Sequence, residues 1–94
     1  MEALRITDSE AKGHLKARLA RIEGQIRGLQ EMIEREGDCE QIAQQTVAVR
    51  VAFHKFFAEM IANELQAIEA EKHMSAEARH KRWAALVNIL SKYA

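Results

Sequence analysis

Residues 18–29 read RLARIEGQIRGL, and this stretch lies within a longer helical pattern. Apolar side chains in and around it recur at alternating intervals of four and three residues, which places them along one side of an α-helix. Charged and small residues fall between them, as expected for a helix that packs against another helix. The apolar positions of this stripe are Leu15, Leu19, Ile22, Ile26, Leu29 and Ile33.

The sequence also marks the two ends of this first helix. Thr7 is followed three residues later by Glu10, the capping-box pattern in which the two side chains satisfy free backbone N–H groups. At the other end, Gly37 is expected to interrupt the helix just after Glu36. The pattern therefore predicts a first helix over about residues 8–36.

A second helix is expected over about residues 39–72. Asp38 is suited to cap it, with Gln41 three residues further on in a second capping-box arrangement. Nothing breaks the helix before about Lys72, so it should be about 50 Å long at 1.5 Å per residue. It is apolar on more than one side, and one neighbouring helix cannot cover all of that surface. The sequence thus predicts self-association.

A third, shorter helix is expected over about residues 76–92, with Ser75 as its N-cap. We expect it to pack across the ends of the two longer helices. No strand pattern competes with these three segments, so the sequence predicts an all-α fold and a single domain over residues 1–94. The apolar stripe of the third helix consists of Trp83, Leu86, Val87, Leu90 and Tyr93.

Composition limits the classes of protein that this chain can belong to. The single cysteine cannot form an intramolecular disulfide, and no segment reaches the roughly 18 consecutive apolar residues of a membrane span. These features favour a cytoplasmic protein with no membrane partner. The net charge is zero, yet residues 12–30 carry five cations and one anion. A neutral chain with such a segment can still present a basic surface to nucleic acid.

Two motifs lie in order along the first two predicted helices. They combine as RLxRIEGQIRGL, then DC at 38–39, then QQxxAVR at 44–50. This combination resembles the CsoR/RcnR/FrmR family of bacterial repressors. The resemblance implies a three-helix protomer that pairs into an antiparallel four-helix bundle and assembles into a tetramer. It also implies binding to operator DNA, with release when a small effector binds. Effectors within the family are Cu(I), Ni(II) or Co(II), formaldehyde and sulfur species.

Basic residues of the two motifs are the candidates for contact with DNA. Phosphate contacts by such side chains would give affinity and a strong dependence on salt, with little direct readout of sequence. The alternative is that these cations form solvated ion pairs with acidic residues of the first helix. The candidates for DNA contact are Lys16, Arg18, Arg21 and Arg50, and the candidate ion-pair partners are Glu23, Glu31 and Glu34.

The resemblance places the effector site at Cys39 and at positions further along the second helix of the neighbouring protomer. Many family members have a histidine 25 residues after the cysteine, where this chain has Glu64. Metal sensors often have a further ligand 29 residues after it, where this chain has Ile68. Cu(I) prefers thiolate and imidazole ligands, so a copper site is disfavoured. Cys39 and Glu64 could hold Zn(II) or Co(II) only with additional ligands.

Three alternatives remain open at the level of sequence. Cys39 could be a small, partly buried packing residue, since unreactive cysteines behave as small apolar side chains. The whole chain could be an oligomeric helical interaction module that has lost DNA binding or the effector response. The third alternative, an enzyme, is not expected, because neither a glycine-rich phosphate loop nor a nucleophile–histidine–acid set is recognisable. The histidines are expected to be surface or packing residues: His14, His54, His73 and His80.

Overall fold

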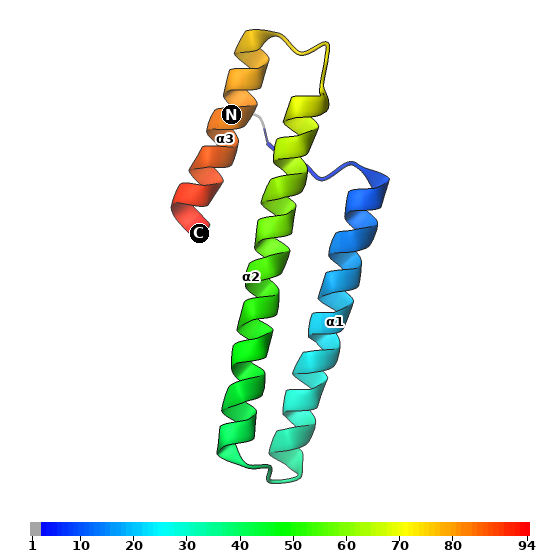
Figure 1. Cartoon of the computed structure of the whole chain (residues 1–94), viewed down its shortest axis with the longest axis vertical. Coiled ribbons are helices and arrows are strands. Elements are labelled where there is room, and N and C mark those ends of the chain that lie inside the picture. The colour runs from blue at the N-terminus through cyan, green and yellow to red at the C-terminus, as the bar shows by residue number, and fades with distance from the viewer. Residues whose placement is uncertain (1–2) are drawn as a thin grey trace.

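A computed structural model of the chain describes residues 3–94, which fold into three α-helices. These are α1 (Ser9–Glu34), α2 (Cys39–Ala70) and α3 (Ala76–Tyr93). In Figure 1, α1 and α2 run antiparallel as a long hairpin, and α3 folds back along the other side of α2. The predicted all-α fold is confirmed. The prediction that the third helix packs across the ends of the longer helices is wrong. This helix lies beside the C-terminal half of α2.

The N-terminal caps show one difference from the prediction. The side chains of Asp38 and Ser75 cap α2 and α3 as expected. For α1 the cap is Asp8 and not Thr7, so the predicted capping box is wrong. Asp8 Oδ2 accepts a hydrogen bond of 2.8 Å from the backbone N–H of Ala11. A carboxylate is the stronger acceptor at the positive end of a helix dipole, which explains the shift by one residue.

The C-terminal end of α1 also differs from the prediction. The residue in the left-handed conformation is Glu36, with φ of 57°, and not Gly37. The N–H of Glu36 donates to the carbonyl of Ile33, and that of Gly37 donates to Met32 at 2.7 Å. This pair of bonds is a Schellman motif. Glycine still suits position 37, because a Cβ there would be crowded, 3.0 Å from the carbonyl oxygen of Met32.

Arg79 attaches the start of α3 to the end of α2. Its Nη1 donates a hydrogen bond to the carbonyl of Ile68, and its Nη2 donates one of 2.5 Å to the carbonyl of Glu71. The last carbonyls of a helix have no partner within the helix itself. The guanidinium therefore satisfies two acceptors at the C-terminus of α2 and orients α3 against that end.

Few apolar side chains of the described residues are buried within one chain. The buried set lies on both sides of α2 and consists of Leu15, Ile22, Ile68, Ala85 and Leu86. Much of the predicted stripes stays accessible, and the exposed members are Ile26, Ile33, Trp83, Val87, Leu90 and Tyr93. Within residues 3–94, no helix combines the length and the apolar character needed to cross a membrane.

Candidate functional site

A hollow of about 210 Å³ lies between α1 and α2, and cationic side chains surround it. Arg18 and Arg21 reach it from α1, where a spacing of three residues puts them on the same side of the helix. Lys55 reaches it from α2. We call this hollow the basic groove, and its remaining lining residues are Ile22, Gln25, Ala48, Val51 and Ala52.

One cation of the basic groove has an acidic partner. Arg18 Nε donates to Glu59 Oε2, which lies one turn beyond Lys55 on α2. The Arg18 side chain is 36% exposed and that of Glu59 is 24% exposed. Water therefore screens this pair in part, and its contribution to stability is about 1 kcal/mol or less. Arg18 thus forms an ion pair, as the alternative to DNA contact expected, but its acidic partner lies on α2 and not on α1.

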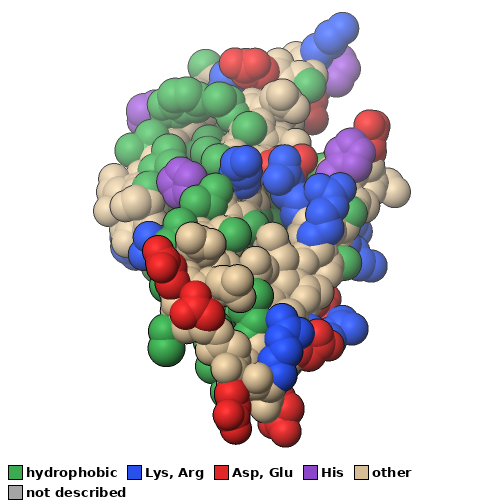
Figure 2. All heavy atoms as spheres, turned by 60° about the horizontal axis from the view of Figure 1, so that its bottom comes forward, with side chains coloured by type: hydrophobic (Ala, Val, Ile, Leu, Met, Phe, Trp, Pro, Cys, Tyr) green, Lys and Arg blue, Asp and Glu red, His purple; other side chains and the backbone are tan. Residues whose placement is uncertain are grey.

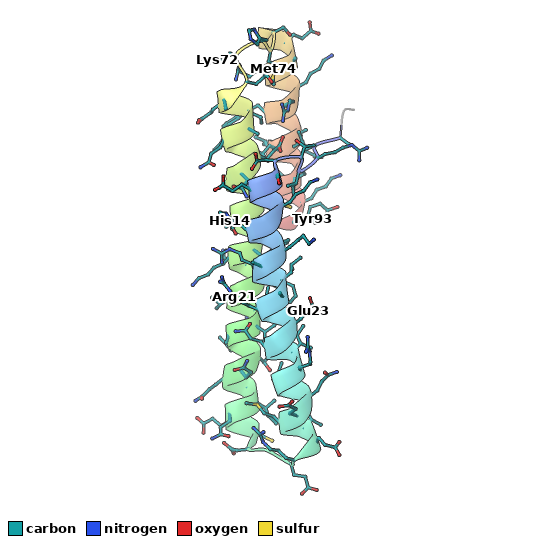
Figure 3. The ribbon with its side chains drawn as sticks, turned by 90° about the vertical axis from the view of Figure 1, so that its right-hand side faces the viewer. His14, Arg21, Glu23, Lys72, Met74 and Tyr93 are labelled. Atoms are coloured by element: carbon teal, nitrogen blue, oxygen red, sulfur yellow. The ribbon has the colours of Figure 1, made fainter. Side chains whose placement is uncertain are left out.

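Acidic residues of the first helix are not the partners of these arginines. Figure 3 shows Arg21 and Glu23 pointing to opposite sides of α1, with His14 on the same side as Arg21. Among residues 3–94, the carboxylates of Glu23, Glu31 and Glu34 form no ion pair. The alternative with those three partners is therefore wrong for this chain.

The four residues expected to contact DNA do not lie on one surface of a single chain. Lys16 precedes Arg21 by five positions, and Arg50 precedes Lys55 by five. At 100° per residue, each is rotated about 140° from its counterpart in the basic groove. Lys16 and Arg50 are both exposed, on other faces of their helices. The fold thus brings Arg18 and Arg21 together and leaves Lys16 and Arg50 apart.

Sequence reasoning missed Lys55 and Glu59, although a usable signal was present. The hairpin turns at residues 35–38, so residues on its two helices face each other at roughly equal distances from that turn. By this count Arg18 lies level with residues 55–59 of α2. A charged pair one turn apart at that level, Lys55 and Glu59, was visible in the sequence.

Cys39 is the first residue of α2 and is exposed to solvent. Asp38 precedes it as the helix cap, with Oδ2 3.4 Å from the backbone nitrogen of Gln41. Within one chain the thiol is not partly buried among apolar side chains, so the packing interpretation fails for the isolated chain. The sulfur is accessible to a reactant or ligand in water.

Glu64 has a very different environment, because its residue surface is only 8% exposed. Its Oε1 lies 2.5 Å from Nη2 of Arg82, which α3 supplies. A buried carboxylate requires such a partner to offset its loss of hydration. Sequence reasoning missed Arg82, since nothing in the linear spacing indicates that α3 returns to this level of α2.

The segment before α1 covers Glu64 on a second side. One cavity of about 120 Å³ is mostly apolar, and Leu4, Ile6 and Leu86 are among the residues that line it together with Glu64. A smaller cavity of about 50 Å³ is lined by residues that include Glu64, Arg82 and residues 5–8. Glu64 therefore lies where the N-terminal segment, α2 and α3 meet.

Cys39 and Glu64 are far apart within one chain. They are 25 residues apart on one continuous helix, which corresponds to about 38 Å at 1.5 Å per residue. Among residues 3–94, no three His, Cys, Asp or Glu side chains come together in a way that could hold a metal ion. Residues 3–94 of one chain therefore bring together no such ligand set for a metal ion, and the guanidinium of Arg82 already pairs with Glu64. The four histidines are exposed, as expected.

Comparison with known proteins gives consistent results for sequence and structure. A family model described as metal-sensitive transcriptional repressor matches residues 11–92. The transcriptional repressors RcnR of Salmonella paratyphi B and of Salmonella typhimurium are each 32% identical over 83 residues, which is 87% of this chain and 90% of theirs. A variant of the formaldehyde-responsive regulator FrmR from Salmonella enterica serovar Typhimurium superimposes with a TM-score of 0.82. It is 28% identical, and the match covers 95% of this chain and all of the other.

Proposed function

The chain belongs to the CsoR/RcnR/FrmR family of metal-sensitive transcriptional repressors, and on that basis we propose that it represses transcription by binding operator DNA until an effector releases it. The relatives are repressors and not enzymes, in agreement with the absence of catalytic motifs from the sequence. Such a protein acts in the cytoplasm, where its operator lies.

The observation that carries this proposal is the basic groove. Arg18, Arg21 and Lys55 converge there from two helices, in a chain whose net charge is zero. Concentrating cations on one surface of a neutral protein attracts a polyanion and steers its approach. Lys16 and Arg50 would add phosphate contacts from other faces once several copies of the chain sit along one duplex.

Self-association is part of the proposal. One chain leaves large apolar side chains such as Phe53 and Trp83 about half exposed, at 45% and 48%. A second hairpin packed antiparallel would cover exposed apolar side chains such as these and form a four-helix bundle, and two such dimers would form a tetramer. Antiparallel pairing would also bring Cys39 of one copy to the level of Glu64 in the other.

We place the effector response at Cys39, with Glu64 of a second copy beside it. The accessible thiol and the missing ligand cluster favour a reactive small molecule that acts on sulfur. A metal ion such as Zn(II) or Co(II) is the other effector class that the family allows. Either effector must interact preferentially with the DNA-free state, because otherwise it shifts no equilibrium.

Operator binding is the direct test. The purified full-length protein is titrated into a labelled duplex from its own upstream region at several salt concentrations. We expect Arg21→Ala to weaken binding and to reduce the slope of log K against log salt by about 1. Unchanged binding in this variant would remove the groove from the interface, and no binding by the parent protein would favour the helical interaction module.

Effector exposure tests the second half of the proposal. The protein–DNA complex is treated separately with formaldehyde, a persulfide, Zn(II) and Co(II), and release is recorded alongside the intact mass. We expect one treatment to release the DNA from the parent protein but not from Cys39→Ala. Release that persists in Cys39→Ala would move the effector site away from the thiol.

A further inference from the structure

We infer that the basic groove seats one phosphate of the DNA backbone, that Lys55 contacts this phosphate directly, and that Glu59 competes with it for Arg18. This inference deepens the proposed repressor function and rests on it. It assigns roles to two residues of α2 outside the sequence motifs. Figure 2 shows Lys and Arg side chains gathered close together on one part of the molecular surface.

The charges of the groove are unbalanced in the structure. Three cations line one hollow, and a single carboxylate, that of Glu59, pairs with one of them. Within residues 3–94, neither Arg21 nor Lys55 forms an ion pair. Like charges that share a hollow repel each other, and an anion placed between them attracts each cation and so offsets that repulsion. A phosphate group is an anion that accepts hydrogen bonds from both guanidinium and ammonium donors.

The shape of the groove suits a backbone phosphate. Four of its lining residues are small or apolar, namely Ile22, Ala48, Val51 and Ala52, and Gln25 is the one uncharged polar residue among the rest. Arg18, Arg21 and Lys55 line the same hollow, so their donors are near any anion that enters it. A sugar ring attached to the phosphate would contact the exposed side chain of Val51, which is 46% accessible.

Gln25 adds hydrogen-bonding capacity at the same place. It lines the groove, and its Oε1 is buried without a hydrogen-bond partner among the described residues. A buried amide oxygen without a partner costs free energy, and as placed it cannot bond to a phosphate oxygen, which is also an acceptor. Rotating the amide by half a turn places the N–H₂ group there instead, and that group can donate a hydrogen bond to a phosphate oxygen.

Glu59 lowers the affinity of the basic groove for phosphate. A phosphate that enters must draw Arg18 away from this carboxylate, and it also meets the negative charge of Glu59 nearby. The Arg18–Glu59 pair is partly exposed and weak, so phosphate can displace it. Glu59 consequently lowers the affinity for any DNA, and removing its charge should strengthen binding.

The test uses the full-length protein with an operator duplex and a duplex of unrelated sequence, each over a range of salt concentrations. We expect Lys55→Gln to weaken binding to both duplexes by about three- to tenfold and to reduce the salt slope by about 1. Glu59→Gln should strengthen both by a few-fold, and Lys55→Arg should retain binding. Matched controls are Lys72→Gln and Glu69→Gln, which change exposed charges outside the groove and should alter binding less than twofold.

The outcomes separate this inference from the function on which it rests. Parent-like affinity and slope in Lys55→Gln, with loss in Arg21→Ala, would overturn the role of Lys55 and leave the repressor assignment standing. Weaker binding in Glu59→Gln would overturn the competition. Circular dichroism and sedimentation identify any variant that misfolds, and a second neutral variant, Lys55→Met, then carries the test for Lys55. Failure of the parent protein to bind its upstream DNA would contradict the proposed function itself.

Discussion

At the scale of single residues, the availability of Glu64 to a ligand depends on Arg82, which the fold brings to it from another helix. At the position where the family resemblance leads us to expect a histidine, this chain has a carboxylate, and α3 provides a guanidinium 2.5 Å from it. The pair joins two helices and lies under the N-terminal segment. Any effector that recruits Glu64 must first compete with Arg82, so this position is less available to a metal than an unpaired histidine would be.

The Glu64–Arg82 pair should contribute to stability through the cost of leaving Glu64 alone. We expect Arg82→Met to lower the free energy of unfolding by about 2 kcal/mol, because a buried carboxylate loses its partner while some water still reaches the site. Replacing both residues, as Arg82→Met with Glu64→Leu, should recover most of that loss. Urea unfolding at fixed protein concentration measures all of these variants.

The chain offers a matched control for that comparison. Lys81 pairs with Glu77 at 3.5 Å on the exposed side of α3, where both side chains are mostly accessible. Lys81→Met should change the free energy of unfolding by less than about 0.5 kcal/mol. Equal effects of Arg82→Met and Lys81→Met would show that burial of Glu64 is not what makes its pair important.

At the scale of elements, the turn between α1 and α2 fixes the geometry of the hairpin. Four residues connect the two helices, and the backbone reverses direction through Glu36 and Gly37. A glutamate in the left-handed conformation is strained, since its Cβ approaches the neighbouring carbonyl. The turn therefore forms in spite of Glu36, because the Schellman hydrogen bonds and the packing of the hairpin outweigh that strain.

Relieving this strain should stabilise the protein. We expect Glu36→Gly to raise the free energy of unfolding by about 1 kcal/mol, because glycine adopts positive φ without a steric penalty. Glu34→Gly, two residues earlier at the last residue of α1, should lower it by up to about 1 kcal/mol. Thermal unfolding of both variants provides the measurement, and a loss of stability in Glu36→Gly would contradict the account of the turn.

The elements also show which parts of the fold the sequence can predict. Helix type and position follow from apolar spacing and caps, so Asp38 and Ser75 were identified correctly. The cap of α1 was misplaced because Thr7 and Asp8 are both good caps, and only the backbone path selects between them. The partner of Arg18 and the partner of Glu64 were not predicted, because each depends on which helices become neighbours in space. Of the cations that line the basic groove, Arg18 and Arg21 were singled out from the sequence and Lys55 was not.

On the scale of the whole molecule, the single chain is elongated and has a small interior. It measures 58 × 27 × 17 Å, and only five apolar residues among those described are buried. A chain of this size with so little buried apolar surface has a weak driving force for folding alone. Association with further copies would supply the missing burial, and folding and assembly would then be a single process.

Coupled folding and assembly predicts that stability depends on protein concentration. The midpoint of thermal unfolding should rise by a few degrees for each tenfold increase in concentration, since association stabilises only the folded chain. Phe53→Glu, at an exposed apolar position, should lower both the midpoint and the mass found by sedimentation. Gln44→Glu, at an exposed polar position on the same helix, should change neither. A midpoint independent of concentration would indicate that one chain is stable alone.

The distance between Cys39 and Glu64 has a genetic consequence. If an effector site needs both residues, each site draws one of them from each of two antiparallel chains, and a dimer holds two such sites. A chain without the thiol and a chain without the carboxylate are then each inactive with their own kind. In a dimer made of one chain of each kind, one site has neither residue and the other site has both. Two defective alleles in one cell would thus complement each other, which no site built within a single chain could allow.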